Sequence, residues 1–286
     1  MLAAALDPIV ELHIYDGKGG QDWRAFERIA HRVGYGVRDE TVEALVEDLR
    51  ALVVDMNRRY DTIATLPPEL CPESKVTREI AEKRSLKLWP VLVAIDEFQR
   101  YSGHPVHGDE IVSLLTELCK VGPSVGIMIL LATQKPDGKA VPTDLRDNIG
   151  TRFALKTMTW QSSEAVLGAG SYPAGYDSSR FQRSHKGVGI LLGADDSGAV
   201  EEAVTVRTHF AATQHVQTVV GRALELRRKA GTLTGHAIGQ APDQATSAGD
   251  TLLDDILTVV PATEPKVWSE TVVARLAELR PDVYAG

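Results

Sequence analysis

The stretch Val91-Leu-Val-Ala-Ile-Asp-Glu97 decides the fold of this chain. Its five apolar residues are typical of a strand buried inside a parallel sheet, and two adjacent carboxylates follow directly. A second apolar run, Ile127-Met-Ile-Leu-Leu131, follows about thirty residues later and leads into Thr133 and Gln134. Because ligands bind at the carboxyl ends of parallel strands, we expect the acidic pair and the Thr-Gln pair to lie at that edge of one sheet.

These residue types suit nucleotide hydrolysis. Asp96 would hold Mg²⁺, directly or through water, while Glu97 would orient and polarise the attacking water. Thr133 and Gln134 would lie beside the nucleotide, where the amide could bond the γ-phosphate or the water. The alternative is an ordinary exposed Asp-Glu pair after a buried strand, but the second strand end favours the catalytic interpretation. The cofactors expected on this basis are ATP and Mg²⁺.

Composition sets further limits on the 286 residues. Hydrophobic residues make up 43 % and charged residues 24 %, so we expect a sizeable globular core. No apolar run approaches the roughly 20 residues that cross a bilayer, which predicts a cytoplasmic chain. Cys71 and Cys119 are expected to be structural thiols. The net charge of −8 argues against simple wrapping by DNA, because that binding depends on Lys and Arg neutralising phosphates.

Hydrophobic periodicity predicts strands alternating with helices, and hence an α/β fold with a mostly parallel sheet covered on both faces. The expected strands are residues 9–15, 91–95, 127–131, 151–156, 187–192 and 204–208. The expected helices are residues 39–60, a short polar one within 75–85, one from Asp109 to the Gly122-Pro123 stop, and 212–229.

The chain divides into three parts by composition. Residues 1–229 carry the alternating strands and helices. Residues 230–250 are rich in Gly, Ala, Thr, Ser and Gln, which predicts a linker. Residues 251–286 hold two short apolar-periodic segments, the second with Ser269 as its expected N-cap.

Three ordered motifs resemble the FtsK/SpoIIIE family of DNA-translocating ATPases: Asp96-Glu-Phe-Gln99, Leu131-Ala-Thr-Gln-Lys-Pro136 and Asn148-Ile-Gly-Thr-Arg-Phe-Ala154. The turn Asp16-Gly-Lys18 resembles that family's Asp-Pro-Lys, with Gly in place of Pro. The similarity covers roughly residues 2–235.

Two further stretches, Cys71-Pro-Glu-Ser-Lys-Val-Thr77 and Leu88-Trp-Pro90, resemble the actinomycete branch associated with conjugative elements. The resemblance implies a RecA-like P-loop NTPase motor core that forms hexameric rings and pumps double-stranded DNA through the central pore.

The resemblance also implies roles for single residues. Asp96 and Glu97 match the Walker B positions, and Gln134 matches the sensor. Arg152 lies where the family places an arginine that reaches the neighbouring subunit's nucleotide; the alternative is a strand-edge arginine paired with a carboxylate. Lys18 is either a phosphate contact or a turn lysine, and the turn is favoured.

The DNA contacts expected in such a ring lie in loops after the central strands. The basic residues there are Arg100, Lys135, Lys139 and Arg146. Solvated loops of mixed charge are the alternative for each of them. No metal is expected beyond the Mg²⁺ of the nucleotide.

One departure from the family is plain in the sequence. Gly17-Lys-Gly19 and Gly138-Lys-Ala140 are not followed by Ser or Thr, so no phosphate loop is present. The expectation is that Met1 falls inside a longer motor, with residues 2–6 as the end of the phosphate-loop helix. This chain alone is then predicted to be inactive. Residues 251–286 would open a winged-helix-like module.

The leading hypothesis is therefore a double-stranded DNA translocase motor that serves conjugal transfer or chromosome segregation. A type VII secretion ATPase, which moves proteins, is one alternative. A non-hydrolytic subunit that docks on a complete motor and contributes Arg152 is another. Any membrane tether of the intact protein is expected to lie in segments outside this chain.

Overall fold

The computed structural model describes residues 1–194, 203–240, 259–260 and 267–279. Two compact units make up the chain, Met1–Gln240 and Ala241–Gly286. The first unit therefore includes residues 230–240, eleven residues that the sequence analysis assigned to the linker. In the second unit, α10 (Ser269–Leu279) forms near the expected N-cap, while residues 251–258, 261–266 and 280–286 lie outside the described residues.

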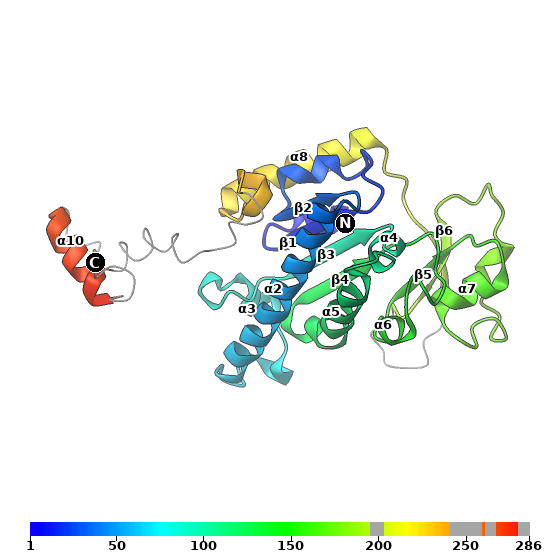
Figure 1. Ribbon diagram of the computed structural model, residues 1–286, viewed down its shortest axis with the longest axis horizontal. Coiled ribbons are helices and arrows are strands. Elements are labelled where there is room, and N and C mark those ends of the chain that lie inside the picture. The colour runs from blue at the N-terminus through cyan, green and yellow to red at the C-terminus, as the bar shows by residue number, and fades with distance from the viewer. Residues whose placement is uncertain (195–202, 241–258, 261–266, 280–286) are drawn as a thin grey trace. The chain divides into compact units, whose positions relative to one another are not determined.

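The main sheet has four parallel strands in the order β2-β1-β3-β4 (Figure 1). Asp16 is paired in register with Asp96, so the ends of the two central strands lie side by side. In the described part of the chain β4 has β3 as its one strand neighbour, and Met128 and Leu130 on β4 are exposed. The strands are β1 (Glu11–Asp16), β2 (Arg32–Tyr35), β3 (Val91–Asp96) and β4 (Ile127–Leu131).

Helices cover both faces of this sheet (Figure 1). On one face α2 (Asp39–Ala64) and α5 (Gly108–Val121) enclose the larger apolar core. On the other face α1 (Leu2–Leu6), the 3₁₀ turn η1 (Arg24–Arg28) and α8 (Thr213–Ala230) enclose a second core. This layering is the expected α/β architecture.

The later strands form a separate sheet instead of extending the parallel one. β5 (Arg152–Leu155), β6 (Val188–Leu192) and β7 (Val204–Arg207) pair antiparallel in that order. The helix α7 (Trp160–Leu167) packs against β5, and their core contains Ala154, Leu167 and Ile190.

Most of the expected elements form close to their expected bounds, but β2 and α7 were missed. β2 is short and includes a polar residue and Gly34, so it carries little strand signal. Residues 135–147, which follow β4, contain a short helix, α6 (Thr143–Asp147). The remaining short elements are α3 (Arg78–Glu82), α4 (Gln99–Ser102), and the 3₁₀ turns η2 (Pro72–Ser74), η3 (Arg84–Leu86), η4 (Gly122–Val125), η5 (Ser178–Arg180) and η6 (Gly235–Ile238).

Both cysteines are free, Cys71 buried and Cys119 half-buried. Among the described residues, no helix is long and apolar enough to cross a membrane.

Candidate functional site

The ends of β1 and β3 bring two carboxylates together at the carboxyl edge of the main sheet. Asp16 is buried, and its carboxylate accepts hydrogen bonds from the backbone N–H groups of Lys18 (2.9 Å) and Gly20 (2.7 Å). The N–H of Gly17 donates to the carbonyl of Asp96 at 3.0 Å. A Cβ at position 17 would meet the Glu97 carbonyl oxygen at 3.0 Å, so the approach of the two strand ends favours glycine there.

Neutral groups hold the carboxylate of Asp96. One oxygen accepts the backbone N–H of Glu97 at 2.9 Å, and the other accepts the indole N–H of Trp23 at 3.0 Å. Among the described residues, neither Asp16 nor Asp96 forms an ion pair with a basic side chain. Their charges are therefore oriented but not neutralised.

Two amide side chains hold Glu97. Gln134 donates to one carboxylate oxygen and Gln99 donates to the other. The Thr133 hydroxyl in turn donates to the Gln99 side-chain oxygen at 2.6 Å. Glu97 itself has φ +52°, a left-handed backbone conformation that is uncommon for a residue with a side chain. Such a conformation re-aims the carboxylate immediately after the strand, and it is found repeatedly at functional sites.

The structure thus brings together four of the residues singled out from the sequence: Asp96, Glu97, Thr133 and Gln134. The cluster fits Mg²⁺, which prefers oxygen ligands and is bound in nucleotide sites through one or two carboxylates. Asp96 and Asp16 supply two carboxylates, and neither is paired with a basic side chain among the described residues. Of these, Asp96 is the residue expected to hold the ion.

Arg152 lies outside this cluster, at the start of β5. Its guanidinium donates to the backbone carbonyls of Ile149 (2.9 Å), Arg146 (2.9 Å) and Leu167 (3.4 Å). The carboxylate partner considered as the alternative is not among these contacts. The arginine is thus held by its own chain, and its action on a neighbouring subunit stays a prediction.

Lys18 lies in the turn after β1, where its backbone N–H caps Asp16 and its side chain is exposed. The four basic residues expected to contact DNA follow β3 and β4. Arg100 is on α4, Lys135 and Lys139 are exposed in the loop after β4, and Arg146 is on α6. All four therefore follow the strand ends that carry the acidic cluster.

Sequence reasoning missed three members of the cluster. Asp16 ends an apolar strand, which is the same signal that identified Asp96, but the glycines after it indicated only a turn. Gln99 was quoted within a motif and given no role. Trp23 carries no recognisable signal, since it reaches Asp96 across 73 positions of sequence.

Comparison with known proteins adds to this geometry. No family model matches the chain. It is 28 % identical over 166 residues to the DNA translocase FtsK of Treponema pallidum, covering 57 % of this chain and 18 % of that protein. It is 26 % identical over 198 residues to the ESX-1 secretion system protein EccCa1 of Mycobacterium tuberculosis, covering 65 % of this chain and 25 % of the relative.

Among solved structures, the chain resembles the pCW3 conjugation coupling protein TcpA, which was determined with ATPγS. The TM-score is 0.56 at 18 % identity, covering 76 % of this chain and 57 % of that one. A likeness at this identity shows the fold alone, an α/β core with a mostly parallel sheet covered by helices. The chain spans a quarter or less of the two curated relatives it matches here.

Proposed function

Because the chain belongs to the FtsK/SpoIIIE family of ATPases, we propose that it supplies the Walker B half of an ATP-driven motor that translocates double-stranded DNA. The motor is proposed to work as a hexameric ring. The observation that carries the proposal is the cluster of Asp96, Glu97 and Gln134 at the carboxyl edge of a parallel sheet.

Each residue of the cluster has a defined part in this proposal. Glu97 orients the attacking water or accepts a proton from it. A general base placed in this way accelerates a reaction by about 10²–10⁴-fold. Gln134 is bonded to Glu97, so a bound nucleotide competes with Glu97 for the same amide. The Mg²⁺ held by Asp96 neutralises phosphate charge when it is bound.

The open edge of β4 offers the place for a phosphate loop. Met128 is 41 % exposed and Leu130 38 % exposed, although both faces of a parallel sheet are normally covered by helices. We propose that a strand and helix bearing the phosphate loop pair with β4 and cover these side chains. Either the same polypeptide or a partner subunit would supply them.

The test uses two preparations: the 286-residue chain alone, and the chain with the phosphate-loop strand and helix of a homologous motor fused ahead of Met1. The chain alone should hydrolyse ATP negligibly. The fusion should show Mg²⁺-dependent hydrolysis that double-stranded DNA stimulates, and Glu97→Gln should lower the rate at least about a hundredfold. Glu117→Gln, an exposed change on α5, is the matched control and should leave the rate unchanged.

A triplex-displacement assay then identifies the cargo. Displacement of a third DNA strand by the fusion, lost with Glu97→Gln, supports DNA translocation. ATP hydrolysis that ignores DNA and responds to a secreted substrate peptide would favour protein transport, the process named for the EccCa1 relative. Robust DNA-stimulated turnover by the 286-residue chain alone would contradict the proposed need for a phosphate loop.

A further inference from the structure

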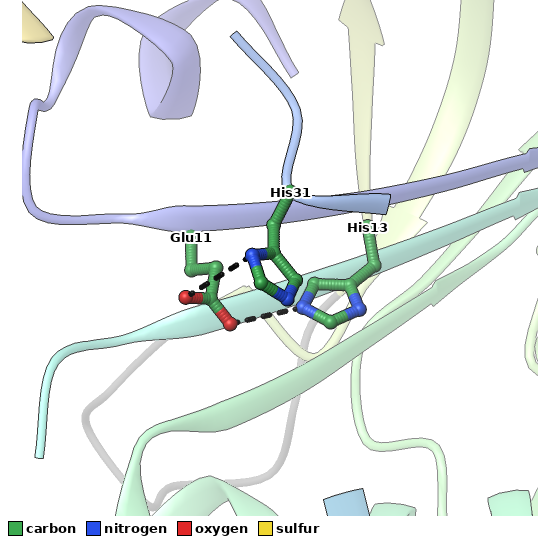
Figure 2. A group of neighbouring side chains, drawn as sticks. All are labelled: Glu11, His13 and His31. Carbon is green, nitrogen blue, oxygen red and sulfur yellow. Dashed lines mark hydrogen bonds and ion pairs between the residues drawn. The ribbon is translucent and has the colours of Figure 1, made fainter. Parts of the chain in front are cut away.

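A second polar cluster lies at the opposite end of β1 from Asp16. Glu11 and His13 point to the same face of β1, and His31 enters beside them just before β2 (Figure 2). β1 rises about 3.3 Å per residue, so Glu11 lies about 16 Å along the strand from Asp16. The Asp96 site and this cluster are therefore separate.

The three side chains converge on one point. Glu11 Oε1 lies 3.1 Å from His13 Nε2, and Glu11 Oε2 lies 3.9 Å from His31 Nδ1. One ligand atom from each residue lies within 4.8 Å of the other two. Two ligands bound tetrahedrally to Zn²⁺ at 2.0–2.1 Å are about 3.3 Å apart, so small side-chain rotations would complete the set.

Other residues hold these side chains in the manner of a metal site. Asp48 Oδ2 on α2 lies 2.7 Å from His13 Nδ1, and metal-bound histidines commonly donate their second ring N–H to a carboxylate. Trp89 donates its indole N–H to Glu11 Oε2 at 3.2 Å. His31 Nδ1 is 2.8 Å from the Thr234 hydroxyl, while His31 Nε2 makes no hydrogen bond with the described residues.

Burial distinguishes this cluster from an ordinary surface group. His13 is 2 % exposed, whereas the side chain of His31 is 24 % exposed. A bound ion would thus be held from inside the protein and reached from the His31 side. Two imidazoles and one carboxylate suit zinc and its neighbours in the first transition series, and they leave a fourth position for water.

We propose that Glu11, His13 and His31 form a binding site for a divalent ion of the zinc type. Ligation uses the lone pair of His13 Nε2, so a proton held there passes to solvent as the ion binds. Through Thr234, which touches His31, the ion would also strengthen the attachment of the segment after α8. In that segment His236 donates its backbone N–H to the His31 carbonyl at 2.9 Å.

The test uses the full 286-residue chain, stripped with EDTA and titrated with Zn²⁺ against a chromophoric chelator. One high-affinity ion should bind per chain, with a rise in the melting temperature that EDTA reverses. His31→Gln and Glu11→Gln should each weaken binding at least tenfold, and Co²⁺ in place of Zn²⁺ should give the visible spectrum of a tetrahedral site. Far-UV circular dichroism checks that each variant folds.

The control removes another pair of histidines. His104 and His107 lie with their rings 5.5 Å apart in a different part of the fold, so His104→Gln with His107→Gln should leave Zn²⁺ binding unchanged. The proposal is overturned if the folded chain binds no ion beyond background. Binding that survives His31→Gln, or that depends on His104 and His107, overturns it equally. In those cases Glu11, His13 and His31 form an ion-pair network only.

Discussion

The carboxylates at the two ends of β1 have different partners: neutral backbone groups at one end and a histidine at the other. At the carboxyl end, Asp16 is held by backbone N–H groups. At the amino end, Glu11 lies 3.1 Å from His13, whose other ring nitrogen lies 2.7 Å from Asp48. At the Asp16 end of β1 the negative charge has no cationic partner among the described residues. At the Glu11 end the negative charges of Glu11 and Asp48 are offset by His13. Buried charge without a cation is costly, so it persists where a ligand is expected to offset it.

Electrostatics at the amino end follow from this pairing. Burial alone would lower the pKa of His13, but Asp48 and Glu11 raise it to about 9. Burial alone would raise the pKa of Glu11, but His13 and His31 bring it down to about 2. His31 differs, because burial lowers its pKa below the ordinary value. In the metal-free protein the strongest pairing is therefore a protonated His13 between two carboxylates.

The largest effect expected is that of Asp48→Ala. The change leaves the His13 imidazolium and the Tyr15 hydroxyl, which donates to Asp48 at 2.8 Å, without their shared buried partner. The free energy of unfolding should fall by about 3–5 kcal/mol, measured by urea denaturation.

Glu110→Gln provides the control for this effect. Glu110 pairs with Arg50 on the protein surface, where an ion pair contributes about 0–1 kcal/mol. If the two variants lose the same free energy of unfolding, then the buried contacts of Asp48 with His13 and Tyr15 stabilise the protein no more than a surface ion pair does.

The next effect is a dependence of stability on pH, measured in EDTA. The folded pKa of His13 lies above its ordinary value of 6.5, so its contribution is complete below pH 6.5 and is lost as the pH rises through 9. The loss should be on the order of 3 kcal/mol. Glu11 acts in the opposite sense, with a contribution complete above pH 4.5 and lost as the pH falls towards 2.

Urea denaturation at pH 5.5, 7.5 and 9 checks the alkaline limb of this profile, the one that depends on His13. Asp48→Asn removes the main partner of His13 and should flatten the alkaline limb. If the free energy of unfolding of the wild type stays constant from pH 6.5 to 9, then His13 is not stabilised by Glu11 and Asp48, and the proposed difference between the two ends of β1 is wrong.

The smallest effect is expected at the carboxyl end, from Trp23→Phe. The change removes the indole N–H that donates to Asp96 at 3.0 Å, while a ring is kept beside Phe26, 5.5 Å away between centroids. The free energy of unfolding should fall by about 1 kcal/mol, since one hydrogen bond is lost and no ion pair is broken. A loss as large as that of Asp48→Ala would show that Trp23 does more than orient a carboxylate.

Much of the fold could be predicted because its signals are local. β3 and β4 are continuous apolar runs, and the apolar stripes of α2 and α5 repeat with helical spacing. β2 escaped prediction because it has four residues and gains its stability from pairing with β1. The antiparallel sheet of β5, β6 and β7 could not be predicted in the same way, because local sequence patterns locate strands but do not show which strands pair or in which direction.

The sequence by itself determined that two apolar strands end in Asp96-Glu97 and Thr133-Gln134, because hydrophobic runs and the polar residues after them are local features. Only the tertiary structure decided that Gln134 bonds Glu97, that Trp23 bonds Asp96, and that Glu11, His13 and His31 meet. Those contacts depend on how parallel strands register and on which loops return to the sheet. Both are set by the packing of the whole core and not by neighbours along the chain.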